Sequence, residues 1–185
     1  MKFALLSRLL IFSFTGFFLM PVRVDAENPA LVDHTFEDIA VKARIPEGWH
    51  VSRDEEEGVV VYQVSRERPG ASGEYHVGFT LSMTHDVPGR AGLQPGRYAE
   101  DLLSFAVEDG GGEIAKETRG PWTIFRAEYS IEGISGELRI LDHVVANDQT
   151  GTLYFLAWQM PGNETETLGE IRDAVINSLV FDPEK

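Results

Sequence analysis

The sequence Leu153-Tyr154-Phe155-Leu156-Ala157-Trp158 is almost entirely apolar. A strand that packs on one face alternates apolar and polar residues, whereas a strand without that alternation is usually buried on both faces. This segment therefore predicts a central strand in a sheet that has helices on both of its faces.

Period-two alternation and β-branched or aromatic residues predict more strands on both sides of this segment. Ile39, Val41, Ala43 and Ile45 are apolar at every second position before Pro46. Proline and glycine mark loops over 66–73 and 86–94. The predicted strands span residues 39–45, 59–64, 75–83, 122–131, 134–146, 152–160 and 179–181.

Two segments have helical periodicity. Pro95 suits the first turn of a helix that ends at Gly110. Asn163 and Glu166 have the spacing of a capping box, which predicts a second helix after residue 163. Their predicted buried stripes are Tyr98, Leu102, Phe105 and Ala106 in the first helix, and Leu168, Ile171, Ala174 and Val175 in the second.

Antiparallel strands with two separated helices predict an α+β fold. The expected architecture is an antiparallel sheet of about six to seven strands flanked by helices on both faces, an α/β/α sandwich.

The first 26 residues predict a secretory signal peptide. Lys2 and Arg8 precede an apolar run over 9–20, which is shorter than the ~20 residues of a membrane-spanning helix. Val24 and Ala26 fit a cleavage site before Glu27. An uncleaved membrane anchor is the alternative. The expected organisation is a signal peptide over 1–26 and one domain over 27–185, in the periplasm or secreted, with no stable membrane anchor after cleavage.

The composition restricts the possible partners. The chain has 16 Lys and Arg against 30 Asp and Glu, for a formal net charge of −14. Binding to nucleic acid requires clustered basic residues that displace counterions from phosphates, so DNA and RNA are not expected as partners. The negative charge favours solubility and, alternatively, cationic partners. No cysteine is present, which excludes disulfides, thiolate zinc sites and a cysteine nucleophile.

Two further motifs resemble those of a known protein superfamily. The chain has Ile45-Pro46-Glu47-Gly48-Trp49 at a strand end and Ile176-Asn177-Ser178-Leu179-Val180-Phe181 at the end of its last helix. Together they resemble the PsbP/DcrB-like superfamily over the whole of residues 27–185. The resemblance implies an antiparallel sheet flanked by helices and a non-enzymatic binding or accessory role. It brings no shared catalytic residues, so none is transferred to this chain.

Metal binding is the main chemical alternative. The acidic run over 54–57 lacks the ligand spacing and central glycine of an EF-hand loop, which favours a solvated loop. The histidines lack the helical spacing of zinc ligands. A metal-assisted hydrolase or a metal-binding accessory protein would need a site assembled across the sheet from carboxylates with His50, His76 or His143.

The sequence therefore predicts an exported, soluble, non-catalytic binding or accessory domain. We expect it to engage an envelope protein or a small ligand, with no catalytic, metal-ligating or cofactor-binding residue. Loops on a rigid sheet commonly carry recognition, and the arginines of the two loops stand out from the acidic background. The candidate binding surface comprises Arg66, Arg68, Arg90, Trp122 and His143.

Overall fold

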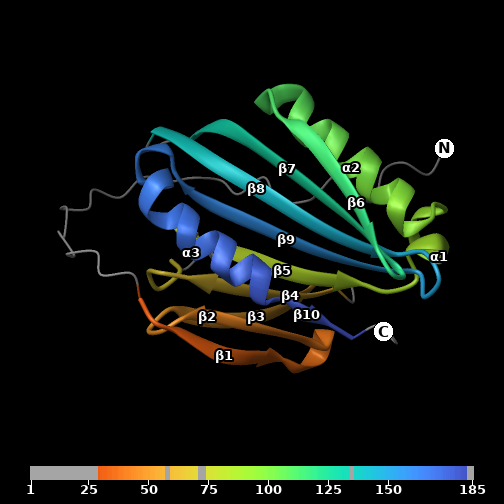
Figure 1. Ribbon diagram of the computed structural model, residues 1–185, viewed down its shortest axis with the longest axis horizontal. Helices are drawn as coiled ribbons and strands as arrows, with labels where there is room; N and C mark the ends of the chain where they lie inside the picture. Colours follow the sequence, from red (N-terminus) through yellow and green to blue (C-terminus); the bar gives the residue numbers. More distant parts are fainter. Residues whose placement is uncertain (1–28, 57–58, 71–73, 134–135, 183–185) are drawn as a thin grey trace.

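The computed structural model describes residues 29–56, 59–70, 74–133 and 136–182. Their main feature is a seven-stranded antiparallel sheet with the order β3-β4-β5-β9-β8-β7-β6 (Figure 1). The predicted α+β class and strand number are confirmed. The strands are β3 (His50–Glu56), β4 (Val59–Ser65), β5 (Gly78–Thr84), β6 (Glu113–Arg119), β7 (Trp122–Gly133), β8 (Gly136–Asn147) and β9 (Thr152–Pro161).

The apolar segment 153–158 lies in β9, the middle strand of the seven. Leu153, Leu156 and Trp158 are buried, and the strand pairs with β5 on one side and β8 on the other. The prediction of a central strand with covered faces is confirmed.

Different elements cover the two faces of the sheet. Helix α2 (Pro95–Gly110) packs on β6, β7, β8 and β9, with the short helix α1 (Val87–Ala91) beside it. Helix α3 (Thr165–Ser178) packs on β9 and β2 on the other face. Phe125, Val144 and Leu103 belong to the core under α2, whereas Trp158, Leu156 and Val175 belong to the core under α3.

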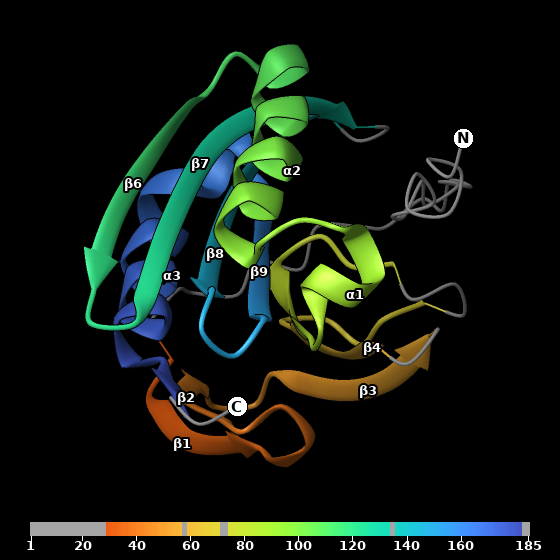
Figure 2. The ribbon, with the colours of Figure 1, turned by 90° about the vertical axis from the view of Figure 1, so that its right-hand side faces the viewer.

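A second, smaller sheet with the order β1-β2-β10 completes the α3 side. Its strands are β1 (Leu31–Phe36), β2 (Val41–Pro46) and β10 (Val180–Phe181). Figure 2 shows the chain leaving α3 and entering β10 next to β2. The alternating residues of the predicted strand over 39–45 are buried as expected, but Ile39 lies in a 3₁₀ turn (Glu37–Ile39). The sequence patterns did not predict a separate sheet.

The helix predictions need three corrections. Helix α2 has its predicted bounds, but Phe105 is 76% exposed and the buried positions are Ala99 and Leu103. In α3, Ala174 is exposed and Ile176 is buried. Asn163 does not cap α3, because it lies in a 3₁₀ turn (Gly162–Glu164) and no side chain caps the helix start. Helical periodicity alone therefore predicted which residues of each helix are buried only to within about one position.

Some segments predicted as loops are regular structure. Asp54 and Glu55 belong to β3, although both are exposed. Residues 87–91 form α1, whose start is capped by Asp86 through a hydrogen bond from Gly89 N–H to Oδ1 (3.1 Å). Strands β1, β3 and β6 were not predicted. The predicted signal peptide over 1–26, parts of the loops at 57 and 71–73, and the start of the strand predicted from 134 lie outside the described residues.

Candidate binding groove

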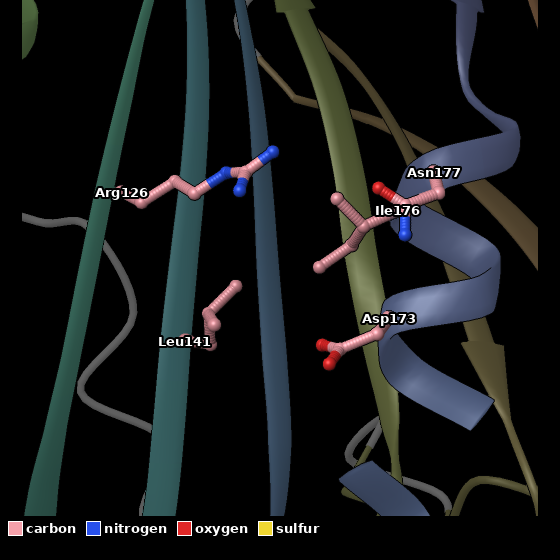
Figure 3. A pocket seen from close by; sticks show the side chains of 5 residues that line it. All are labelled: Arg126, Leu141, Asp173, Ile176 and Asn177. Atoms are coloured by element: carbon pink, nitrogen blue, oxygen red, sulfur yellow. The ribbon is translucent and has the colours of Figure 1, made fainter. Parts of the chain in front are cut away.

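A groove lies between α3 and the strands β7 and β8, on the face of the sheet opposite α2 (Figure 3). Its volume is about 150 Å³. The lining combines charged, amide and aliphatic side chains, which come from two strands and one helix. The lining residues are Arg126, Leu141, Asp173, Ile176 and Asn177.

Strand and helix periodicity place these side chains together. Arg126 pairs with His143 in the β7–β8 register, so both side chains point to the α3 face, and Leu141 is two residues further along that face. Helix α3 buries Leu168, Ile171, Val175 and Ile176. Asp173 and Asn177 are four residues apart, so they lie on adjacent turns of α3, on the side of the helix that borders the groove.

His143 holds the Arg126 side chain. Arg126 Nε–H donates to His143 Nδ1 at 3.1 Å, and His143 is only 4% exposed. Burial lowers the pKa of His143 to about 4, and the positive charge of Arg126 adds to this effect. The imidazole is therefore neutral at pH 7, with Nδ1 as the acceptor and the other nitrogen as the donor. In Figure 3 the Arg126 side chain runs from β7 across β8 toward α3.

Ion pairs surround the groove. Arg172, whose side chain is 12% exposed, donates to Asp173 Oδ1 at 2.9 Å and reaches Glu128 Oε1 at 3.4 Å. Arg126 Nη2 lies 3.9 Å from Glu117 Oε1, which is longer than a hydrogen bond. The carboxylate side chains of these pairs are 40–59% exposed, and pairs with exposed carboxylates contribute little stability. Their effect here is to place both signs of charge around a partly apolar floor.

The residue before His143 lies in a different environment. Asp142 points to the α2 face, is 3% exposed, and accepts a hydrogen bond from the Tyr129 hydroxyl to Oδ2 at 3.0 Å. Burial raises the pKa of Asp142 to about 7, and the Tyr129 hydrogen bond opposes that rise. A methyl group on Gly110 would lie 2.7 Å from the Tyr129 ring, so the end of α2 closes tightly over this pair.

A second hollow, of about 340 Å³, lies between α2 and the strands β6 and β7. Its charged groups pair with each other: Arg97 with Asp101 at 2.7 Å, and Lys116 with Glu100 at 2.6 Å. Lys116 also lies over the ring of Phe125. The charges of this hollow pair with one another, whereas Arg126 and Asp173 of the groove pair with residues outside its lining, so the hollow is the weaker candidate.

The structure separates the five residues of the sequence-predicted surface. Arg66 forms an ion pair with Glu164 at 2.6 Å, just after the end of β9. Arg90 is in α1, whose first N–H bonds to the carbonyl of Gly151, just before the start of β9. The length of a ten-residue strand, about 30 Å, therefore separates Arg66 from Arg90. Arg68 is exposed near Arg66.

The other two predicted residues lie on the groove side of the sheet. Trp122 is half-buried and packs against Tyr154 and Phe181, with ring centroids 6.0 and 6.1 Å away. His143 lies behind Arg126 and contacts the groove only through it. Sequence reasoning missed Arg126, Asp173 and Asn177. The charged Arg126 within the apolar run Ile124-Phe125-Arg126-Ala127 was the available signal.

Within the described ranges, no group of three or more His, Asp and Glu side chains is arranged to hold a metal ion. His50 and His76 are at the end of the sheet near Arg66, because His50 pairs with Ser65 and the His76 N–H bonds to Glu67. His143 lies elsewhere, on β8. No helix in the part of the chain that the structure describes is both long and apolar enough to cross a membrane.

Comparisons with known proteins identify the fold. No family model matches the sequence, and no curated protein matches it. Among solved structures, cyanobacterial PsbP (CyanoP) from Synechocystis is similar over 88% of this chain and 99% of its own, with 12% identity and a TM-score of 0.55. A protein of unknown function, PA94 from Pseudomonas aeruginosa, is similar over 83% of this chain and 98% of its own, with 11% identity and a TM-score of 0.50. The chain therefore has the PsbP-like fold that its sequence motifs predicted.

Proposed function

We propose that this protein is a non-catalytic binding or accessory domain whose ligand or partner engages the groove between α3 and the β7–β8 strands. The observation that carries the proposal is the lining of that groove. It presents a guanidinium from β7, and a carboxylate and an amide from α3, around Leu141 and Ile176. A few placed polar groups around an apolar floor are typical of ligand sites.

The chemistry of the groove supports binding without catalysis. His143 is the imidazole next to the groove, but its Nδ1 accepts the Arg126 Nε–H and its side chain is buried. A general base must reach the proton that it removes from a substrate. His143 in this position serves to orient Arg126.

The proposal includes export. Residues 1–26 have the charged, apolar and cleavage regions of a signal peptide in order. We propose that the domain over 27–185 works in the periplasm or outside the cell, without a membrane anchor, and engages an envelope protein or a small ligand. N-terminal sequencing of the protein from the periplasmic or medium fraction tests export, with Glu27 as the expected first residue.

A blocked groove tests binding. Asn177→Trp would fill the groove from the exposed side of α3, and Ser104→Trp places the same ring at the hollow on the α2 face. Protein recovered from its own compartment is analysed by native mass spectrometry for retained small molecules and proteins. We expect the wild type and Ser104→Trp to retain the same molecule and Asn177→Trp to lose it. Equal retention by all three proteins would contradict the groove as the binding site.

A further inference from the structure

We infer that the groove takes a small zwitterion, a free amino acid with an aliphatic side chain. Arg126 would bind its carboxylate, Asp173 its ammonium group, and Leu141 with Ile176 its side chain. This inference rests on the proposed binding function and names the chemical class of the ligand.

The carboxylate end of the ligand would meet Arg126. Its Nε–H is engaged by His143 and its Nη2 has only the long ion pair with Glu117, so the two terminal nitrogens keep donors for a ligand, and they extend toward α3 (Figure 3). A planar guanidinium binds a carboxylate through two parallel hydrogen bonds. The nearby carboxylate of Glu117 is 3.9 Å from Nη2, too far for a hydrogen bond that would compete with the ligand. Because His143 fixes the rotamer of Arg126, less side-chain freedom is lost on binding.

The ammonium end would meet Asp173 on the opposite side of the groove. The carboxylate of Asp173 is turned toward Leu141 and Arg126 in Figure 3. Arg172 donates to Asp173 Oδ1 at 2.9 Å and also reaches Glu128, so one guanidinium is shared between two carboxylates. Asp173 Oδ2 is therefore the acceptor for a ligand. Asn177, one turn further along α3, adds an amide with both donor and acceptor atoms.

The charge pattern favours a ligand that carries both signs. A simple anion that pairs with Arg126 would also face Asp173 and the field of a chain with net charge −14. A simple cation that pairs with Asp173 would face Arg126. A zwitterion places an opposite charge against each of them, which is the arrangement of a complementary interface.

The size of the groove limits the ligand. Its volume is about 150 Å³. This is smaller than the ~300–1,000 Å³ of pockets for drug-sized ligands. Leu141 and Ile176 are each 8% exposed, so they offer a small apolar contact beside the charged groups. A single amino acid with a branched aliphatic side chain fits these limits, whereas a longer peptide would extend out of the groove.

Calorimetric titration of the protein over 27–185 tests the inference with four probes. L-Leucine carries both charges and the side chain, 4-methylpentanoate lacks the ammonium group, 3-methylbutylamine lacks the carboxylate, and glycine lacks the side chain. We expect leucine to bind at least about tenfold more tightly than 4-methylpentanoate and 3-methylbutylamine, a difference of ~1.4 kcal/mol, and about twofold more tightly than glycine, because the exposed apolar surface is small. The variant Asp173→Asn is expected to lose the preference over 4-methylpentanoate, and Arg126→Gln the preference over 3-methylbutylamine.

Two further variants keep the test decisive. Arg126→Lys retains the positive charge but not the planar guanidinium that forms two parallel hydrogen bonds with a carboxylate. It therefore separates the effect of lost charge from the effect of lost geometry, and it replaces Arg126→Gln if that variant does not fold. Arg97→Gln removes an arginine from the hollow on the α2 face and is expected to leave leucine binding unchanged. Equal affinity for leucine and 4-methylpentanoate, or leucine binding that survives both Arg126 variants, would overturn the zwitterion inference.

The same titrations separate this inference from the proposed function. If no probe binds while Asn177→Trp still loses a natural ligand that the wild type retains, the zwitterion inference is wrong and the groove remains the binding site. If no probe binds and Asn177→Trp retains everything that the wild type retains, both are wrong. If leucine binds and Asn177→Trp abolishes that binding, both are supported.

Discussion

The two faces of strand β8 bury adjacent polar residues in opposite ways. Asp142 points under α2, where the Tyr129 hydroxyl is its partner and the layer above is closed. His143 points to the α3 side, where it holds Arg126 at the edge of an open groove. Both residues are at most 4% exposed. The same strand thus contributes a sealed structural layer on one face and the support of a binding site on the other.

Burial acts on both residues by the same physical effect, since a low-dielectric surrounding disfavours the charged form. The pKa of the acid rises to about 7 and the pKa of the imidazole falls to about 4. The consequences for function differ. A neutral His143 is an acceptor that orients a cation toward solvent, whereas Asp142 is enclosed with Tyr129 and contacts no ligand surface.

The largest expected effect tests whether the α2 face is the more closely packed one. Leu103 of α2 is fully buried against the sheet, whereas Leu141 borders the groove. We expect Leu103→Ala to lower the free energy of unfolding by ~3–5 kcal/mol and Leu141→Ala by about 2 kcal/mol, because a site that borders solvent leaves less of an empty cavity. Urea unfolding measures both. Equal losses would contradict the difference between the faces.

The second prediction concerns the charge of Asp142. The pKa of Asp142 rises from 3.8 in the unfolded chain to about 7 in the fold, so the folded protein binds the proton more tightly between these values. Its contribution to stability is therefore present below about pH 4 and is lost as the pH rises through about 7.

Asp142→Asn removes this titration and keeps an acceptor for Tyr129. We expect the variant to be more stable than the wild type by roughly 2–3 kcal/mol at pH 8 and equal to it near pH 4. Urea midpoints at both pH values measure the difference. The control is Asp33→Asn, because the Asp33 side chain is 97% exposed. A variant that is less stable at pH 8 would show that Asp142 is stabilising as a carboxylate.

The third prediction concerns His143, whose effect on stability changes with pH in the direction opposite to that of Asp142. The pKa of His143 is lowered from 6.5 to about 4 by folding, so the unfolded chain binds the proton more tightly. The contribution of His143 to the free energy of unfolding is therefore present above about pH 6.5 and is lost as the pH falls toward 4. His143→Gln, which retains an acceptor for Arg126, is expected to gain roughly 2 kcal/mol over the wild type at pH 4.5 and nothing at pH 7.5.

His85→Gln is the control for this measurement, because the His85 side chain is exposed. The two titrations overlap between about pH 4 and pH 6.5 and oppose each other, so the wild type conceals both. Each single variant should reveal the slope of the remaining residue. Parallel pH profiles for Asp142→Asn and His143→Gln would contradict the opposite burial of the two groups.

The smallest effect compares the starts of the two helices. Helix α2 is held by a remote cap, since the Gly96 N–H donates to Asp148 Oδ1 at 2.8 Å, whereas α3 has no side-chain cap. We expect Asp148→Ala to cost about 1 kcal/mol and Asn163→Ala less than about 0.5 kcal/mol. Thermal melting at fixed pH measures both. A larger loss for Asn163→Ala would restore the capping box that the sequence suggested.

Much of the fold was predictable because it depends on local patterns. The apolar run over 153–158 indicated its central position, and Pro95 with Gly110 and Gly111 indicated the bounds of α2. Strand β6 escaped prediction because it is an edge strand with mainly exposed residues, so its burial pattern is weak. The cap at Asp148 was equally hidden, since it joins residues that are distant in the sequence.

The amino-acid sequence by itself determined the α+β class, the order of most elements and the central strand, because backbone sterics and the periodicity of burial act between near neighbours. The tertiary structure alone decided the β1-β2-β10 sheet and the groove. Arg126 and Asp173 are on separate elements, and only the β7–β8 register and the packing of α3 bring them to one cavity. Such pairings depend on the sum of many weak contacts between distant segments, which no local pattern records.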